Sequence, residues 1–227
     1  PRWSRCAPLP PKPTVIAFDT SAAHCAAALL LGDQVVTRID DMAKGQAEHL
    51  MPMVNELLAA EGLRWADLDA IGVGIGPGNF TGIRISVAAA RGLSLGLAKP
   101  AIGVSTLEAQ AYGISGVVAS CMRAPRGRVY MQGFCNGPTT KPALCEMRAD
   151  DMPPLPARAE PLVCGDAAQE IGDLMGWQPV DTGHPYIVGI AKLARARMHS
   201  TTKRPAPLYL RPADAAPPRD PAPTILA

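Results

Sequence analysis

Two short polar stretches near the start of the chain carry residue types that bind phosphate. Asp19-Thr20-Ser21 follows the apolar segment TVIAF, and the stretch GPGNFTGIR follows the uncharged run AIGVGI. A carboxylate with hydroxyls at a strand end suits a metal-bound nucleotide phosphate. Glycines let the backbone amides at a helix N-terminus approach an anion. The candidate nucleotide or phosphate residues are Asp19, Thr20, Ser21, Gly76, Gly78, Asn79, Thr81, Gly82 and Arg84.

Each stretch also has an ordinary structural interpretation. The glycine-rich stretch could be a tight turn from strand to helix, capped by Thr81. The acidic stretch could be a polar strand end that turns into a hairpin. No Lys-Ser or Lys-Thr pair follows Gly82, so the spacing differs from that of a P-loop. Together the two stretches favour a nucleotide site, but they supply no catalyst.

Other catalytic and metal chemistries lack a motif. The four histidines, His24, His49, His184 and His199, are never spaced three or four apart, so no helix face offers a metal pair. There is no G-x-S-x-G sequence, and the six cysteines include no C-x-x-C pair. We therefore predict reduced, buried thiols, no metal site and no catalytic residue in this chain.

Composition predicts a globular protein. Of 227 residues, 48% are apolar and 19% are charged, and the net charge of +2 is too small to indicate a nucleic-acid or membrane surface by itself. No apolar run reaches the ~18–20 residues of a membrane span. The Pro-rich start lacks the apolar core of a signal peptide, so we expect a cytoplasmic protein that does not contact membranes.

The order of the expected elements predicts an α/β fold. Strands are expected at 14–20, 25–31, 34–39, 70–75, 101–105, 116–122, 128–134, 143–148 and 161–165, and helices at 48–61, 81–98, 107–112, 167–175 and 185–198. A hairpin leading into helix-connected strands predicts a ribonuclease-H-like mixed sheet with helices on its faces. The expected divisions are a Pro-rich tail (1–13), an N-terminal lobe (14–112), a C-terminal α/β lobe (113–211) and a second Pro-rich tail (212–227).

Both long helices are more apolar than one core requires. On helix 48–61 the apolar arc covers roughly 160°. Helix 81–98 has charges only at Arg84 and Arg91, and small residues form one of its faces. This pattern predicts that a second helix, from another protein, packs there; the alternative is burial within this chain. The candidate docking residues are Met51, Val54, Leu58, Ala88, Ala89, Gly92 and Gly96.

Several segments resemble the bacterial TsaB family, also called YeaZ. They are VIAFDTS (15–21), LMPMVNELL (50–58), DAIGVGIGPGNFTGIRISVAAARGLSLGL (69–97), IGVSTLEAQA (102–111) and PLYLR (207–211). The resemblance implies a two-lobed member of the actin, sugar kinase and Hsp70 (ASKHA) superfamily. It also implies a non-catalytic scaffold subunit that pairs with a TsaD-like catalytic subunit and a TsaE-like ATPase. The complex would form N6-threonylcarbamoyladenosine (t6A) on tRNAs that read ANN codons.

The resemblance leaves several points open. It leaves open whether the chain alone is a monomer or a homodimer. It implies no cofactor of its own, although ATP or ADP could bind at an interface of the complex. In Arg123-Ala124-Pro125-Arg126-Gly127-Arg128, arginines replace acidic residues common in the family. The alternative function is a free-standing ATP-binding and ATP-hydrolysing protein, or a peptidase-like protein, that uses Asp19 and the Gly78–Gly82 cleft.

Overall fold

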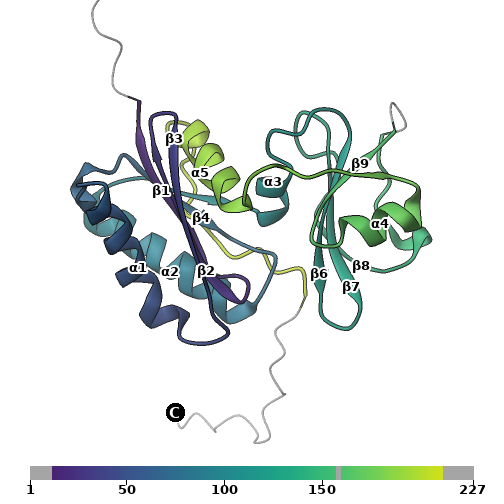
Figure 1. Cartoon of the computed structure of the whole chain (residues 1–227), viewed down its shortest axis with the longest axis horizontal. Coiled ribbons are helices and arrows are strands. Elements are labelled where there is room, and N and C mark those ends of the chain that lie inside the picture. The colour runs from purple at the N-terminus through teal and green to yellow at the C-terminus, as the bar shows by residue number, and fades with distance from the viewer. Residues whose placement is uncertain (1–11, 157–159, 212–227) are drawn as a thin grey trace, which may run out of the picture.

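The computed structural model describes residues 12–156 and 160–211, which form two five-stranded mixed sheets with flanking helices (Figure 1). The strands are β1 (Thr14–Asp19), β2 (His24–Leu31), β3 (Gln34–Asp41), β4 (Ala70–Gly74), β5 (Ala101–Val104), β6 (Val118–Ala124), β7 (Arg128–Phe134), β8 (Ala143–Glu146), β9 (Leu162–Gly165) and β10 (Gln178–Pro179). The helices are α1 (Gln46–Ala60), α2 (Phe80–Leu97), α3 (Thr106–Gln110), α4 (Ala168–Met175) and α5 (Tyr186–Arg197). Residues 1–11 and 212–227, which hold nearly all of the two predicted tails, lie outside the described residues.

The first sheet has the strand order β3-β2-β1-β4-β5. Strand β1 pairs antiparallel with β2 and parallel with β4, and β4 pairs parallel with β5. Every residue of β4 is buried, as its unbroken apolar sequence predicts for a central strand covered on both faces. The mixed sheet expected from the sequence is therefore confirmed.

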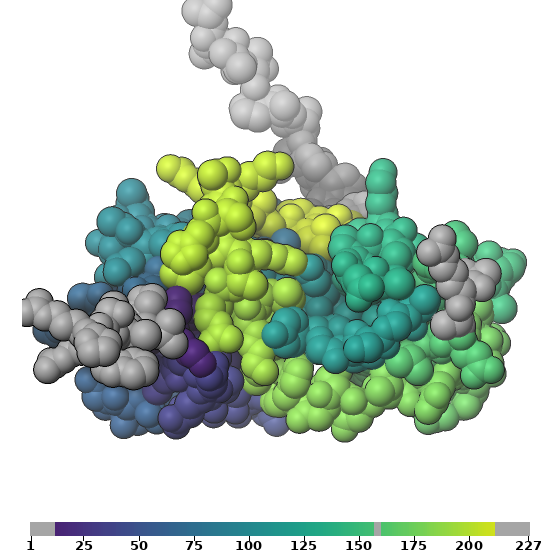
Figure 2. Space-filling model, turned by 90° about the horizontal axis from the view of Figure 1, so that it is seen from above, coloured from purple at the N-terminus to yellow at the C-terminus, as the bar shows by residue number. Residues whose placement is uncertain are grey.

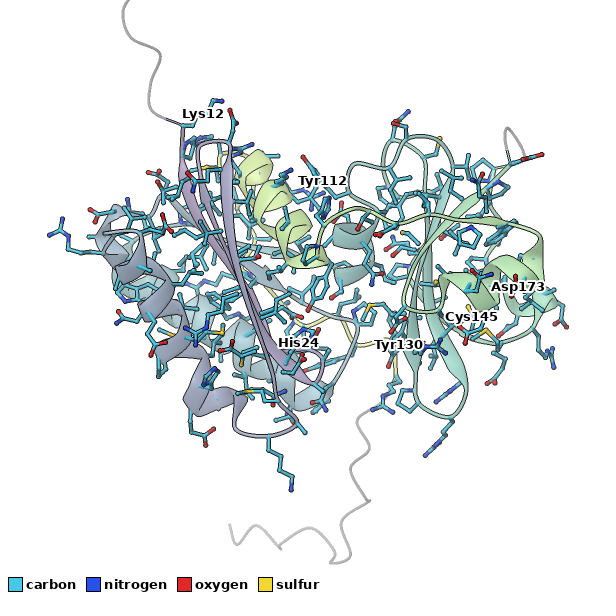
Figure 3. The ribbon with its side chains drawn as sticks, in the orientation of Figure 1. Lys12, His24, Tyr112, Tyr130, Cys145 and Asp173 are labelled. Carbon is cyan, nitrogen blue, oxygen red and sulfur yellow. The ribbon has the colours of Figure 1, made fainter. Side chains whose placement is uncertain are left out.

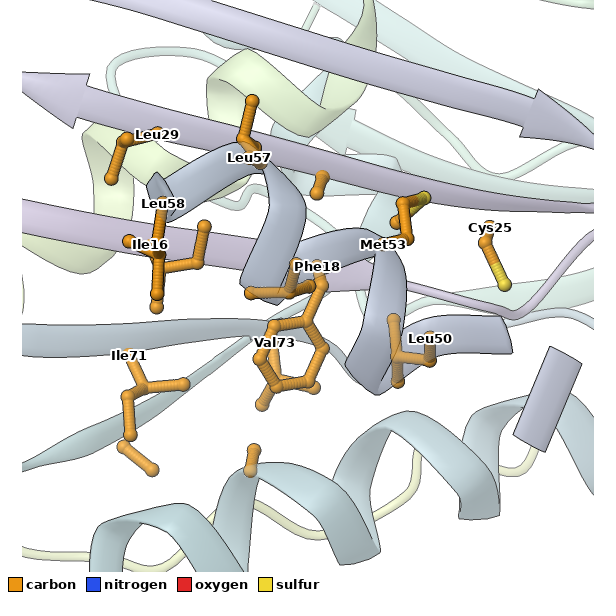
Figure 4. Packing of buried hydrophobic residues seen from close by; sticks show 14 of the residues in the cluster. Ile16, Phe18, Cys25, Leu29, Leu50, Met53, Leu57, Leu58, Ile71 and Val73 are labelled. Atoms are coloured by element: carbon orange, nitrogen blue, oxygen red, sulfur yellow. The ribbon is translucent and has the colours of Figure 1, made fainter. Parts of the chain in front are cut away.

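Helices α1 and α2 cover one face of the first sheet. Leu50 and Met53 of α1 are fully buried and belong to the same cluster as Phe18 and Val73 of the sheet (Figure 4). Helix α5 covers the opposite face, where its buried residues join a separate cluster with β1, β2 and β5. With helices on both faces, the central strands are fully enclosed.

The wide apolar arc of α1 is covered by this chain. Val54 and Leu58, which the sequence placed on a docking face, are 0% and 1% exposed and lie in the core. The prediction that these two side chains are free to contact a partner is therefore wrong, because the sheet and neighbouring loops of this chain enclose them. Helix α1 also begins earlier than expected, so Pro52 lies beyond its first turn, on an exposed position.

No helix among the described residues is long and apolar enough to cross a membrane.

The second sheet has the order β10-β9-β6-β7-β8. Helix α4 packs on its outer face through Ile171, and α3 packs on the face toward the first sheet through Leu107. Tyr130 of β7 is buried in the same hydrophobic cluster as Leu107, on the side of the second lobe that is nearest the first sheet (Figure 3). The two sheets therefore meet through α3 and the side chains around it.

Helix α5 returns to the first lobe after the second sheet is complete. In the view from above, its yellow-green chain lies over the purple and blue first lobe (Figure 2). Ile187, Ile190 and Ala194 are fully buried with the first sheet. The predicted boundary between residues 112 and 113 assigns α5 to the second lobe. The buried face of α5, however, packs against the first sheet.

Candidate functional site

The two polar stretches lie against each other at one edge of the first sheet. The Asn79 amide donates a hydrogen bond to the Ser21 carbonyl at 2.7 Å. The Thr20 hydroxyl donates to the Gly82 carbonyl at 2.6 Å. Because β1 and β4 are parallel neighbours, the loops after them emerge at the same edge. The structure thus brings together the two stretches that sequence analysis singled out.

Backbone of this chain fills the space beside two of the glycines. A methyl group at Gly82 would lie 1.8 Å from the Thr20 carbonyl oxygen, and one at Gly78 would lie 2.4 Å from the Ser21 carbonyl oxygen. Such distances are far below van der Waals contact. The absence of a side chain at these positions is therefore required by packing between the two loops, whatever else the loops bind.

Asn79, rather than Thr81, caps helix α2. Its side-chain Oδ1 accepts a hydrogen bond from the Gly82 amide at 2.9 Å, and its carbonyl accepts from the Ile83 amide. Thr81 is exposed. The expected cap is corrected by two positions because the helix begins at Phe80, which makes Asn79 the residue before the first turn.

Asp19 lies fully buried at the end of β1, in a network that joins β1 and β2 to the start of α5. Its Oδ2 accepts hydrogen bonds from the Ser21 hydroxyl at 2.7 Å and from the Tyr186 hydroxyl at 2.6 Å. The Tyr186 oxygen also lies 2.7 Å from His24 Nε2. Since the tyrosine proton is directed to Asp19, His24 must donate through Nε2. No local motif announces Tyr186 or His24, because their contacts with each other and with Asp19 depend on the return of α5.

Ionisation of Tyr186 is strongly disfavoured. Burial of its hydroxyl, followed by the nearby Asp19 carboxylate, raises the pKa of Tyr186 well above its ordinary value. The hydroxyl therefore remains a donor across the physiological pH range. This keeps the connection between α5 and β1 intact.

Three buried polar atoms at this sheet edge have no hydrogen-bond partner within the described part of the chain. They are Asp19 Oδ1, Ser105 Oγ and Thr106 Oγ1. Asp19 ends β1, and the other two residues follow β5. The edge of the sheet thus keeps unused polar capacity, in spite of the dense packing of the glycine loop.

Arg84 belongs to an aromatic stack rather than to a free cationic site. Its guanidinium lies 3.8 Å from the centre of the Phe80 ring, and its Nε donates to the Tyr209 hydroxyl at 2.8 Å. The Phe80 and Tyr209 rings stack with centres 4.7 Å apart. This stack attaches the segment that includes PLYLR to the first turn of α2.

One face of α2 is open to solvent. This docking face consists of Ala88, Gly92, Leu95 and Gly96, with Ala89 half-buried at its border. Nothing lies within 4 Å of the position of a side chain at Gly92 or Gly96, and Leu95 is 83% exposed. The sequence analysis missed Leu95, although it lies beside Gly92 on a helical wheel. Met51 of α1 is half-buried, unlike Val54 and Leu58.

The arginine-rich hairpin between β6 and β7 is partly neutralised within its own lobe. Arg123 forms an ion pair with Glu170 at 2.7 Å, and its amide donates to Asp166. Arg126 is exposed at the tip, in a left-handed conformation. Of the arginines that invert the charge of this segment, Arg123 is therefore paired with a carboxylate of the same lobe.

Within residues 12–156 and 160–211, no group of three histidine, cysteine, aspartate or glutamate side chains is arranged to hold a metal ion.

Comparisons with known proteins show which family the chain resembles. A family model described as TsaD, tRNA N6-adenosine threonylcarbamoyltransferase, matches residues 40–147. An uncharacterized protein of Mycobacterium tuberculosis is 35% identical over 208 residues, which cover 90% of this chain and 94% of that protein. YeaZ from Pseudomonas aeruginosa superimposes with a TM-score of 0.70 and 25% identity, over 87% of this chain and all of that one.

The Escherichia coli protein named tRNA threonylcarbamoyladenosine biosynthesis protein TsaB is 37% identical over 99 residues. The chain belongs to the TsaB/YeaZ-like family. The match with E. coli TsaB covers 44% of this chain and 43% of that protein, so it spans less than half of either. The mycobacterial relatives, in contrast, are matched over nearly their full length and are named as uncharacterized proteins.

The fold of this TsaB/YeaZ-like chain is the predicted two-lobed ASKHA architecture. The ethanolamine utilization protein EutJ from Carboxydothermus hydrogenoformans shares it, with a TM-score of 0.50 and 17% identity over 82% of this chain and 91% of EutJ. At that identity the likeness concerns the fold alone.

Proposed function

We propose that this chain is a non-catalytic scaffold subunit in t6A biosynthesis, which docks onto a TsaD-type catalytic subunit through the docking face of α2. Two relatives are named tRNA threonylcarbamoyladenosine biosynthesis protein TsaB, which supports a role in that process. One structural observation carries the docking proposal: a fully formed helix exposes Leu95 and two glycines to solvent. Small residues let a partner helix approach closely, and burial of an exposed leucine would stabilise the complex.

The candidate nucleotide site supports a structural role for the glycine loop. Gly78 and Gly82 accommodate backbone of this chain, and the Gly82 and Ile83 amides already donate to Asn79. A phosphate would compete with these internal bonds. In this proposal the chemistry belongs to the TsaD-type subunit, with a TsaE-type ATPase and the ANN-reading tRNA as further components. Any ATP or ADP would bind at an interface of the complex.

The test of the docking proposal is Gly92→Glu, measured by the affinity of the purified chain for the TsaD-type subunit of the same organism. The position is open, so the variant should fold, while a buried unpaired charge should weaken binding at least tenfold. The matched control is Ala196→Glu, at an exposed position of α5 on the opposite side of the sheet. Equal affinity of Gly92→Glu and wild type would contradict this use of α2.

A second function is favoured by the unpartnered Asp19 Oδ1, Ser105 Oγ and Thr106 Oγ1. Under this alternative the chain binds and hydrolyses ATP by itself at the edge of the first sheet. ATP turnover by the isolated chain, abolished in Asp19→Asn, would support it. Absence of turnover in both proteins would leave the scaffold role as the better account.

A further inference from the structure

A groove runs beside the docking face, between the C-terminal half of α2 and the segment after α5. Its volume is about 600 Å³. The walls come from α2 and from residues 201–205, and Pro100 and Ala101 form part of the floor. Arg91 joins the two walls, because its Nε donates to the Pro205 carbonyl at 2.7 Å.

The charges around this groove are all positive. Arg91, Lys203 and Arg204 line it, and no aspartate or glutamate does. All three side chains are exposed, and none forms an ion pair with a carboxylate in the described ranges. The carboxyl end of α2 contributes about half a negative charge nearby, which is less than the three cations. The groove therefore attracts anionic groups.

The uncharged part of the lining combines apolar or small residues with the hydroxyl groups of Ser94, Thr201 and Thr202. Leu95, Ala98 and Pro100 contribute carbon surface, and no aromatic ring is present. Single-stranded nucleic acid usually binds where bases can stack on aromatic rings, so this lining fits a polypeptide better. Gly92 and Leu95 belong to both the groove and the docking face, which makes the two surfaces continuous.

We propose that the groove binds a segment of the partner protein in which apolar side chains are flanked by aspartate or glutamate. The apolar side chains would bury Leu95 and Ala98, and the carboxylates would pair with Lys203 and Arg204. This inference rests on the proposed function, because the partner is the TsaD-type subunit that docks on α2. It adds the chemistry of the partner segment and a second, charged part of the interface.

The experiment is a titration of the TsaD-type subunit with wild type and with the double variant Lys203→Glu/Arg204→Glu. The matched control is Arg126→Glu/Lys141→Glu, which reverses two exposed cations of the second lobe. Binding is measured at about 0.1 M and about 1 M salt, where the screening length falls from ~10 Å to ~3 Å. We expect the groove variant to bind at least tenfold more weakly at the lower salt and to lose most of its salt dependence, while the control binds like wild type.

The outcomes separate the two proposals. No binding by the wild type would overturn the proposed function and the groove with it. Wild-type binding that the groove variant retains in full, with the same salt dependence, would overturn the groove alone. The same holds if the variant loses only a homodimer, or only binding to tRNA, while its affinity for the TsaD-type subunit is unchanged.

A cross-linking measurement identifies the segment itself. A photo-crosslinking amino acid at Thr202, on the groove wall, should attach to a peptide of the TsaD-type subunit that carries aspartate or glutamate beside apolar residues. A cross-linked peptide rich in lysine and arginine, or one without carboxylates, would contradict the proposal.

Discussion

Tyr186 donates a hydrogen bond of 2.6 Å to Asp19, a residue 167 positions earlier in the chain. The bond joins the first residue of α5 to the last residue of β1. Asp19 is fully buried, so each of its donors offsets part of the cost of removing a carboxylate from water. The candidate site is therefore held together by the last helix of the fold.

Replacing Tyr186 with phenylalanine should destabilise the protein by about 1–3 kcal/mol, because Asp19 and His24 each lose a buried partner. The measurement is the urea midpoint followed by circular dichroism. Tyr112→Phe is the matched control, since the Tyr112 hydroxyl forms no hydrogen bond within the described part of the chain, while its ring lies beside His184 and Lys192. Equal midpoints for the two variants would show that the bond to Asp19 contributes little.

Two glycines of α2 should respond in opposite directions to alanine. Gly82→Ala places a methyl group 1.8 Å from the Thr20 carbonyl and should cost several kcal/mol, because the backbone of the adjoining loop must shift. Gly92→Ala meets open space and should stabilise the helix by about 0.5–1 kcal/mol. Thermal unfolding of both variants measures the contrast, and a tolerated Gly82→Ala would argue against the tight contact between the loops.

Asp40 should contribute to stability in a pH-dependent way. Hydrogen bonds from His49 and then Arg38 lower the pKa of its carboxyl group. A lowered pKa in the folded state stabilises the protein above the unfolded value of about 3.9, and this contribution is lost as pH falls through the folded value.

Asp40→Asn should therefore be less stable than wild type by up to about 1 kcal/mol at pH 7, since the side chain is partly exposed. The difference should shrink as pH falls from about 4 toward the lowered folded-state pKa of Asp40, below which both proteins are uncharged at this position. Urea titrations at the two pH values measure it. If the difference in unfolding free energy between wild type and Asp40→Asn did not change with pH, the carboxylate charge would not be its cause.

The five cysteines of the described residues should differ in reactivity. Burial raises the pKa of Cys121 to about 12 and the pKa values of Cys25, Cys145 and Cys164 to about 11. Thiolates are the reactive form, so these four should resist alkylation of the native protein. Cys135 is partly exposed and should react first among the five. Mass spectrometry after brief treatment with iodoacetamide measures the order, and early labelling of Cys121 would contradict it.

Local patterns predicted the elements of the first lobe well. The apolar run of β4 and the spacing of α2 each indicated one structure, because periodicity and turn residues agree there. The position of Asn79 as the cap was missed by two residues, since both Asn79 and Thr81 suit a helix start.

Long-range contacts could not be predicted in this way. The arc of α1 looked too wide for one core, but Val54 and Leu58 are enclosed by elements that a helical wheel does not include. The link from Tyr186 to Asp19 depends on where the chain goes after the second sheet, which no local pattern records. The small-residue face of α2 could be singled out from the sequence, because a helix with so few charges is visible there, and its use in docking stays a prediction.

The return of α5 also sets the order in which the protein can be completed during translation. The face of the first sheet that α5 covers, with Val15, Leu30 and Ile102, stays uncovered on the nascent chain until residues 186–197 have left the ribosome. The second lobe is synthesised in that interval. A premature stop after residue 112 would release a sheet with one bare apolar face, which is a substrate for chaperones and for aggregation rather than a functional fragment.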